Sequence, residues 1–225
     1  NTALSIVDCV TSLGACNVPV DEWGLDIVAS GSQKGYMIPP GLSFIAMSQK
    51  AWEAAEKSNL PKFYLNLKSY RKSLLSNSNP YTPAVNLVFA LDEALKMMRE
   101  EGLHNIFLRH DKHKVAISNA AKALNLKLFA DEKYLSPSIT AIKTEEMNAE
   151  EFRKTIKNNF DILLAGGQDH LKGKIFRVGH LGYINDRDIV TVISAISSTL
   201  LDLGKISAQQ AGEALVVLSK YLEGN

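Results

Sequence analysis

The stretch VDCVTSLGACNVPVDEWGLDIVASGSQKGYMIPPGLSF, residues 7–44, carries the pattern that predicts the fold. One apolar run covers residues 3–7 and ends before Asp8, a second covers 25–30, and a third covers 41–48. Short apolar runs with few polar alternations are typical of strands in a sheet that helices cover on both faces. The sequence therefore predicts an α/β layer architecture.

Helices are expected after the third strand. Residues 48–58 have Ser48 as a candidate N-cap. Residues 82–102 predict a longer helix, with Pro83 in its first turn, apolar side chains at helical spacing and Gly102 as its stop.

The pattern changes from about residue 104. Helix and strand signals then follow in the order helix, strand, strand, helix, strand, strand, helix, over 106–125, 126–130, 138–144, 148–160, 161–167, 174–182 and from about Asp186. This order is typical of a small α+β domain with an antiparallel sheet. We therefore predict two domains, 1–103 and 104–225.

The composition is that of an ordinary globular protein. Of 225 residues, 46% are hydrophobic and 22% charged, and 25 basic residues stand against 24 acidic ones. This balance gives no global field for nucleic acid or a membrane surface, so neither is expected as a partner. No apolar run approaches the roughly 20 residues that cross a bilayer, and no signal peptide is recognised, so a cytoplasmic protein is expected.

Two further observations concern the cysteines and the start of the sequence. Cys9 and Cys16 have no further Cys or His at a metal-ligand spacing, so two reduced, buried thiols and no metal site are expected. The sequence opens with Asn1 almost directly on an apolar run. We therefore expect the C-terminal part of a longer protein.

Lys34 stands in the glycine-flanked segment SGSQKG, directly after the second apolar run. Such a turn is expected to hold the amine partly out of water, and desolvation favours its neutral, nucleophilic form. Asp8 ends the first strand at the sheet edge where α/β proteins bind ligands, so it is a candidate partner for a cationic ring nitrogen. From the residues alone, a solvated turn lysine and a local Asp cap remain the alternative.

Four segments resemble the class V (fold type I) pyridoxal-phosphate aminotransferases, in particular the alanine–glyoxylate and serine–pyruvate branch. They are the quoted stretch with its VDxVxSLG and SGSQKxxxxPPG patterns, PYTPAVNLVFALDEAL (80–95), SPSITAI (136–142) and GKIFRVGHLG (173–182). The resemblance covers the whole chain. It implies a large domain with a mostly parallel sheet, a small C-terminal α+β domain, and pyridoxal 5'-phosphate as the cofactor.

The resemblance also implies roles for five residues. Lys34 would form the Schiff base with the cofactor and act as general acid and base. Asp8 would pair with the pyridinium nitrogen, and Val10, two residues further along the same strand, would pack on the ring. Gln33 would donate to the cofactor phosphate. Thr82 would contact the phosphate of a neighbouring subunit from the start of the long helix, which implies a homodimer.

Arg177 matches the arginine that binds the substrate carboxylate in these enzymes, a task that suits the planar fork of a guanidinium. His180, Arg109 and His110 are interpreted as structural. Asn79 stands where the family often has Tyr, three residues before Thr82. The segment LAGGQDH (164–170) lies in the small domain and is not interpreted as a phosphate loop.

The implied reaction is transamination between alanine or serine and glyoxylate or pyruvate. Gln33 stands where cysteine desulfurases typically have His, so a desulfurase-like lyase is a less favoured alternative. A non-catalytic remnant that serves dimerisation or partner binding is the second alternative. The resemblance also implies that a glycine-rich phosphate loop and a ring-stacking aromatic residue come from a preceding segment or a companion N-terminal polypeptide.

Overall fold

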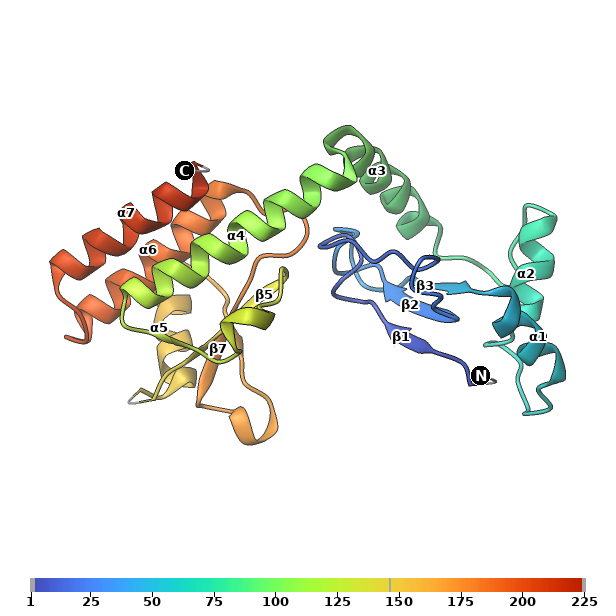
Figure 1. Ribbon diagram of the computed structural model, residues 1–225, viewed down its shortest axis with the longest axis horizontal. Coiled ribbons are helices and arrows are strands. Elements are labelled where there is room, and N and C mark those ends of the chain that lie inside the picture. The colour runs from blue at the N-terminus through green and yellow to red at the C-terminus, as the bar shows by residue number, and fades with distance from the viewer. Residues whose placement is uncertain (1–2, 146, 224–225) are drawn as a thin grey trace. The chain divides into compact units, whose positions relative to one another are not determined.

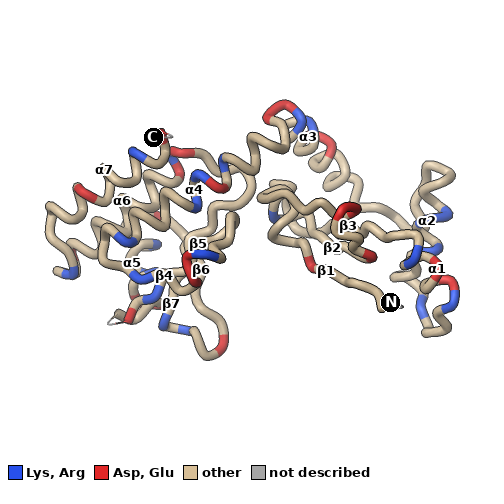
Figure 2. The backbone as a smooth tube through the Cα atoms, viewed as in Figure 1, with Lys and Arg blue, Asp and Glu red and all other residues tan. Residues whose placement is uncertain are grey.

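The computed structural model describes residues 3–145 and 147–223 (Figure 1). It divides into two compact units: Asn1–Leu13 with Val18–Glu100 form unit 1, and Gly14–Asn17 with Glu101–Asn225 form unit 2. The break after Glu100 lies close to the predicted boundary after residue 103. Basic and acidic residues both occur in each of the two units (Figure 2).

Unit 1 contains a three-stranded sheet in the order β1-β2-β3, made of β1 (Ile6–Asp8), β2 (Ile27–Gly31) and β3 (Ser43–Met47). All three lie in the predicted apolar runs. The pair β1/β2 is parallel and the pair β2/β3 antiparallel. In β1 and β3, Ile6 is 71% exposed and Ile45 48% exposed. The expected helical cover on both faces is therefore not met at these positions, because the helices of the described chain leave them open.

The helices of unit 1 are α1 (Gln49–Lys57), α2 (Leu67–Leu75) and α3 (Val85–Glu101), the last reaching one residue into unit 2. Ser48 caps α1 as predicted, since its hydroxyl accepts the Ala51 N–H at 3.1 Å. Helix α2 was not predicted from the sequence. Helix α3 begins at Val85, so Pro83 precedes the helix and does not lie in its first turn.

Asp26 joins the first strands to α1. Its buried carboxylate accepts hydrogen bonds from the Ser5 N–H at 3.0 Å, the Ser48 hydroxyl at 2.9 Å and the Lys50 ammonium at 3.1 Å. The Ser5 N–H has the largest effect, followed by Lys50 and Ser48, and together they lower the Asp26 pKa to about 2. One side chain thus fixes the start of β1, the start of β2 and the N-cap of α1.

Unit 2 contains the predicted antiparallel sheet, in the order β4-β5-β7-β6. Its strands are β4 (Lys127–Leu128), β5 (Ile139–Lys143), β6 (Ala165–Gly166) and β7 (Ile175–Gly179). Its helices are α4 (Leu103–Ala123), α5 (Ala149–Phe160), α6 (Asp186–Asp202) and α7 (Ala208–Leu222), with short 3-10 turns η1 (Glu132–Tyr134) and η2 (Asp169–Leu171). The single final helix that was predicted is wrong. The chain breaks into α6 and α7 at Gly204, which has a φ of 65°, and Ser207 caps the second helix.

The core of unit 2 lies between its sheet and its helices. Phe176 and Val178 of β7 are buried there, together with Ile117 of α4, Ile156 of α5 and Ile196 of α6. Side chains along a strand alternate between its two faces. Arg177, between Phe176 and Val178, therefore points to the face of the sheet that is opposite to this core.

We expect the substitution Asp26→Asn to flatten the acid dependence of stability in unit 1. The Asp26 pKa lies below its ordinary value of 3.8 in the folded protein, so the stabilisation is complete above that value and is lost as the pH falls toward about 2. Urea unfolding of both proteins at neutral pH and at several pH values below 4 measures this. Equal slopes for Asp26→Asn and the unaltered protein would contradict the assignment.

Candidate active site

The lysine turn, residues 32–36, is held in place by a buried serine. The Ser32 hydroxyl donates to the Pro39 carbonyl at 2.8 Å and accepts the Leu42 N–H at 3.1 Å. Its own N–H donates to the Leu42 carbonyl at 3.1 Å. Ser32 thus closes the loop that carries Lys34. This role was not predicted from the sequence, although a hydroxyl residue between glycines in SGSQKG is the kind of signal that marks a side chain bonded to nearby backbone.

Lys34 and Gln33 are exposed on this turn. The expectation that the Lys34 amine is partly withdrawn from water is therefore wrong for the described chain. The physical reason is that Ser32 and Gly35 fill the inside of the turn, so the two longer side chains leave it outward. The Lys34 carbonyl accepts the N–H of Met37, which has a positive φ of 62°.

Asp8 ends β1 opposite Ala29 of β2. Because the two strands are parallel, Asp8 and the turn after β2 lie at the same edge of the sheet. The Oδ1 atom of Asp8 accepts the Val10 N–H at 2.8 Å. Val10 was predicted on the same strand, but β1 ends at Asp8 and Val10 lies in the turn that follows. This correction follows from the Asp8 side chain, which bonds the Val10 backbone and turns the chain away from the ladder.

These residues suit a cationic aromatic cofactor. Asp8 is exposed, and no described residue bonds to its Oδ2 atom, so one carboxylate oxygen is available to a protonated ring nitrogen. Lys34 offers an amine and Gln33 an amide at the same sheet edge. The set of donors and acceptors therefore fits the group that the sequence implies.

Thr82 is exposed and precedes the first residue of α3. Ala84 directly precedes Val85, the first residue of the helix, and its carbonyl accepts the Val88 N–H at 3.1 Å, so Thr82 is not at the helix N-terminus itself. Its neighbour Tyr81 anchors the segment by donating to the Phe63 carbonyl at 3.1 Å. Among described residues, no hydrogen bond joins Thr82 to the lysine turn.

Arg177 lies in unit 2, in the middle of β7. It stands opposite Ala141 on one side and Ala165 on the other. The side chain is half-buried, and its Nε–H donates to the Gly166 carbonyl at 2.8 Å. Because its neighbours Phe176 and Val178 belong to the core, the Arg177 side chain lies on the opposite face of the sheet.

The three residues interpreted as structural make internal contacts of unit 2. The fully buried His180 has its Nε2 atom 3.0 Å from the Thr140 hydroxyl, and burial lowers its pKa to about 4. Arg109 pairs with Glu101 at 2.6 Å. His110 lies on α4 with its Nδ1 2.7 Å from the Ile106 carbonyl.

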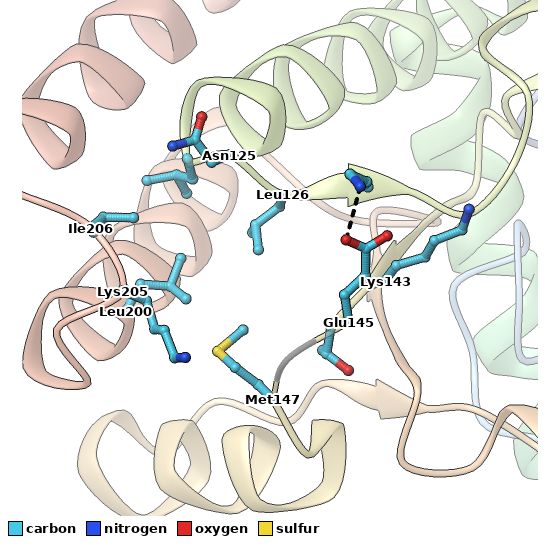
Figure 3. A pocket seen from close by; sticks show the side chains of 11 residues that line it. Asn125, Leu126, Lys143, Glu145, Met147, Leu200, Lys205 and Ile206 are labelled. Atoms are coloured by element: carbon cyan, nitrogen blue, oxygen red, sulfur yellow. Dashed lines mark ion pairs between the residues drawn. The ribbon is translucent and has the colours of Figure 1, made fainter.

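A hollow of about 250 Å³ opens elsewhere in unit 2, below the end of α4 (Figure 3). Leu126, Met147, Leu200 and Ile206 form its apolar lining. An ion pair of 2.9 Å between Lys127 and Glu145 lies at its edge. None of the predicted site residues lines it.

No cluster of three or more His, Cys, Asp or Glu side chains within residues 3–145 and 147–223 is arranged to hold a metal ion. None of the helices described is long and apolar enough to cross a membrane.

We expect Ser32→Ala to destabilise unit 1 by about 1–3 kcal/mol, because the Leu42 N–H and the Pro39 carbonyl lose a buried partner. Urea unfolding measures the change. Ser78→Ala is the matched control, since Ser78 is exposed and lies outside this loop. Equal stabilities of the two variants would contradict the role of Ser32.

The comparisons with known proteins agree on a family. Residues 1–185 match the family described as aminotransferase class-V. The "Soluble hydrogenase, small subunit" of Synechococcus sp. (strain PCC 6716) is 58% identical over 202 residues, covering 90% of this chain and 53% of that protein. The serine–glyoxylate aminotransferase of Methylorubrum extorquens is 35% identical over 231 residues, covering 99% of this chain and 57% of that protein.

The solved structure of ureidoglycine–glyoxylate aminotransferase from Bacillus subtilis superposes with a TM-score of 0.89 at 30% identity, covering 97% of this chain and 58% of that one. This likeness confirms the predicted α/β fold. The chain spans about half the length of the curated relatives it matches. The four sequence segments and the arrangement of Asp8 and the lysine turn at one sheet edge agree with this family match. The chain belongs to the class-V aminotransferase family.

Proposed function

We propose that the chain is part of a pyridoxal-phosphate-dependent aminotransferase. Its substrates are a small amino acid, alanine or serine, and a small 2-oxo acid, glyoxylate or pyruvate. The observation that carries the proposal is the placement of Asp8 and the Lys34 turn at one sheet edge by the parallel pair β1/β2. The similarity to a serine–glyoxylate aminotransferase supports the substrate class.

Pyridoxal phosphate, when bound, supplies a ring that accepts electrons from the substrate. Lys34 would hold the cofactor and move the proton at the substrate Cα, since its amine extends from a turn that Ser32 fixes. Asp8 would keep the ring nitrogen protonated through its carboxylate. Gln33 would donate from its amide to the phosphate, and Val10 would pack against the ring.

Two further residues have proposed roles. Arg177 would bind the substrate carboxylate through its guanidinium, which matches a carboxylate with two parallel hydrogen bonds. Thr82 would contact the phosphate bound by a second copy of the chain, which makes the protein a homodimer. A companion N-terminal segment would provide the rest of the phosphate site.

A partner-binding subunit is the second candidate. The 58% identity to a protein named as a soluble hydrogenase subunit favours it. In that case Lys34, Asp8 and Arg177 would have no chemical task, and their joint presence favours the aminotransferase. A desulfurase-like activity is less favoured, because Gln33 stands where cysteine desulfurases typically have His, and the Cys9 thiol is only 2% exposed.

The test is to incubate the protein, as its gene encodes it, with pyridoxal phosphate and then to reduce it with borohydride. We expect peptide mass spectrometry to find one pyridoxyl group, on Lys34. Transamination of alanine or serine with glyoxylate should fall at least about 100-fold in Lys34→Ala, the typical loss of a general acid and base. Lys172→Ala, which removes an exposed lysine of unit 2, should keep both the pyridoxyl group on Lys34 and the transamination activity.

Label spread over many lysines, unchanged in Lys34→Ala, would contradict the aminotransferase. If, in addition, both the unaltered protein and Lys34→Ala co-purified with hydrogenase subunits from the source cells, the second candidate would take its place.

A further inference from the structure

The glycine pair of LAGGQDH, Gly166 and Gly167, lies beside Arg177 in the structure. Gly166 ends β6 and stands opposite Phe176 of β7, so it is next to Arg177 in the ladder. The Gly167 N–H donates to the Ile175 carbonyl at 3.2 Å. The two glycines therefore continue the sheet along the strand that carries the arginine.

The Gly166 carbonyl occupies one particular N–H of Arg177. It accepts the Nε–H at 2.8 Å. A guanidinium has five N–H groups, and the other four are on Nη1 and Nη2. Within residues 3–145 and 147–223, no hydrogen bond to these two nitrogens is found. A carboxylate that approaches Arg177 therefore meets the Nη1/Nη2 end and not the Nε/Nη2 side.

Gly167 cannot carry a side chain in this conformation. A Cβ atom added there would lie 2.1 Å from the Leu171 carbonyl oxygen and 2.5 Å from its carbon. Both atoms belong to the backbone of the turn η2, which the Leu171 N–H closes by donating to the Gln168 carbonyl at 2.8 Å. Since backbone in a closed turn does not give way cheaply, any larger residue would displace the segment next to Gly166.

The preceding end of β6 is fixed from α5. Arg153 donates from Nε to the Leu164 carbonyl at 2.7 Å and pairs through Nη1 with Glu150, also at 2.7 Å. The Gly166 carbonyl is thus held between an anchor before it, at Leu164, and the close contact after it, at Gly167.

We propose that Gly166 and Gly167 are positioning residues for Arg177. They aim its guanidinium so that a substrate carboxylate binds end-on through Nη1 and Nη2. The inference rests on the proposed function, because it assigns an orientation to the arginine that would bind the substrate. A purely structural role is the competing explanation, in which the bond between Arg177 and Gly166 only joins two strands.

The first test needs no activity. In the protein labelled with 15N-arginine, we expect the Arg177 Nε–H to give a resolved NMR signal, assigned by its loss in Arg177→Lys. Its exchange with water should be slow, and clearly faster in Gly167→Ala. An Arg177 Nε–H that exchanges as fast as that of exposed arginines in the unaltered protein would overturn the proposal, whether or not Gly167→Ala folds.

The second test compares two amines in the first half-reaction of the cofactor-loaded protein, followed by cofactor absorbance. L-Alanine carries a carboxylate and ethylamine lacks it. In Gly167→Ala we expect the KM for alanine to rise roughly 10- to 100-fold, the range for losing a hydrogen bond to a charged group. The kcat for alanine and the rate with ethylamine should stay within about twofold. A purely structural role would impair both amines alike.

Two controls and one double variant complete the design. Gly212→Ala makes the same change at a position where a Cβ meets nothing within 4 Å, and Gln168→Ala alters the exposed neighbour of Gly167. Neither substitution should change the preference for alanine over ethylamine. In an Arg177→Lys background, Gly167→Ala should cost nothing further, because the group it positions is gone.

The outcomes separate the two proposals. Additive losses in the double variant, or an unchanged alanine preference in Gly167→Ala, would overturn the positioning role alone. An unaltered protein that reacts with neither amine would overturn the proposed function.

Discussion

The parallel pairing of β1 with β2 is the constraint on which the candidate site depends. It places the ends of both strands, and therefore Asp8 and the lysine turn, at one edge of the sheet. Asp26 supports this pairing, because its carboxylate ties Ser5 before β1 to Ser48 before α1. The buried Asp26 carboxylate has no role in the proposed reaction, but it helps to fix the positions of Asp8 and the lysine turn.

The two units hold their polar site residues in different ways. In unit 1, the side chain of Ser32 bonds to backbone groups and leaves Lys34 exposed on a fixed turn. In unit 2, a backbone carbonyl of Gly166 bonds to the side chain of Arg177. One arrangement fixes the backbone and leaves the lysine side chain to move, as proton transfer requires. The other fixes the side chain, as the recognition of a carboxylate requires.

Much of the fold could be predicted because its signals are local. The apolar runs marked every strand of the first sheet, and Ser48 marked the start of α1. Helix α2 was missed although Leu67, Tyr70 and Leu74 stand at helical spacing and Asn66 caps its start, because the segment is only nine residues long and none of its residues is buried. The break at Gly204 was missed because apolar residues continue on both sides of it.

The candidate site was harder to predict in its details. The residue types came from motifs, whereas exposure depends on contacts that no motif encodes. Lys34 is exposed because Ser32 and Gly35 fill the turn, and Val10 leaves the strand because Asp8 bonds its backbone. The orientation of the Arg177 side chain depends on the carbonyl of Gly166, which is eleven residues away along the chain. Neither residue spacing nor periodicity reveals this contact.

His110 shows how narrowly one position can be specified. Its Nδ1 meets the Ile106 carbonyl, so it must donate, and its Nε2 accepts the Gly182 N–H at 3.1 Å. Only a neutral imidazole with its proton on Nδ1 offers a donor and an acceptor at opposite sides of a rigid ring. No other natural side chain has this geometry. Position 110 therefore has a strict structural requirement for histidine, although this residue takes no part in the proposed chemistry.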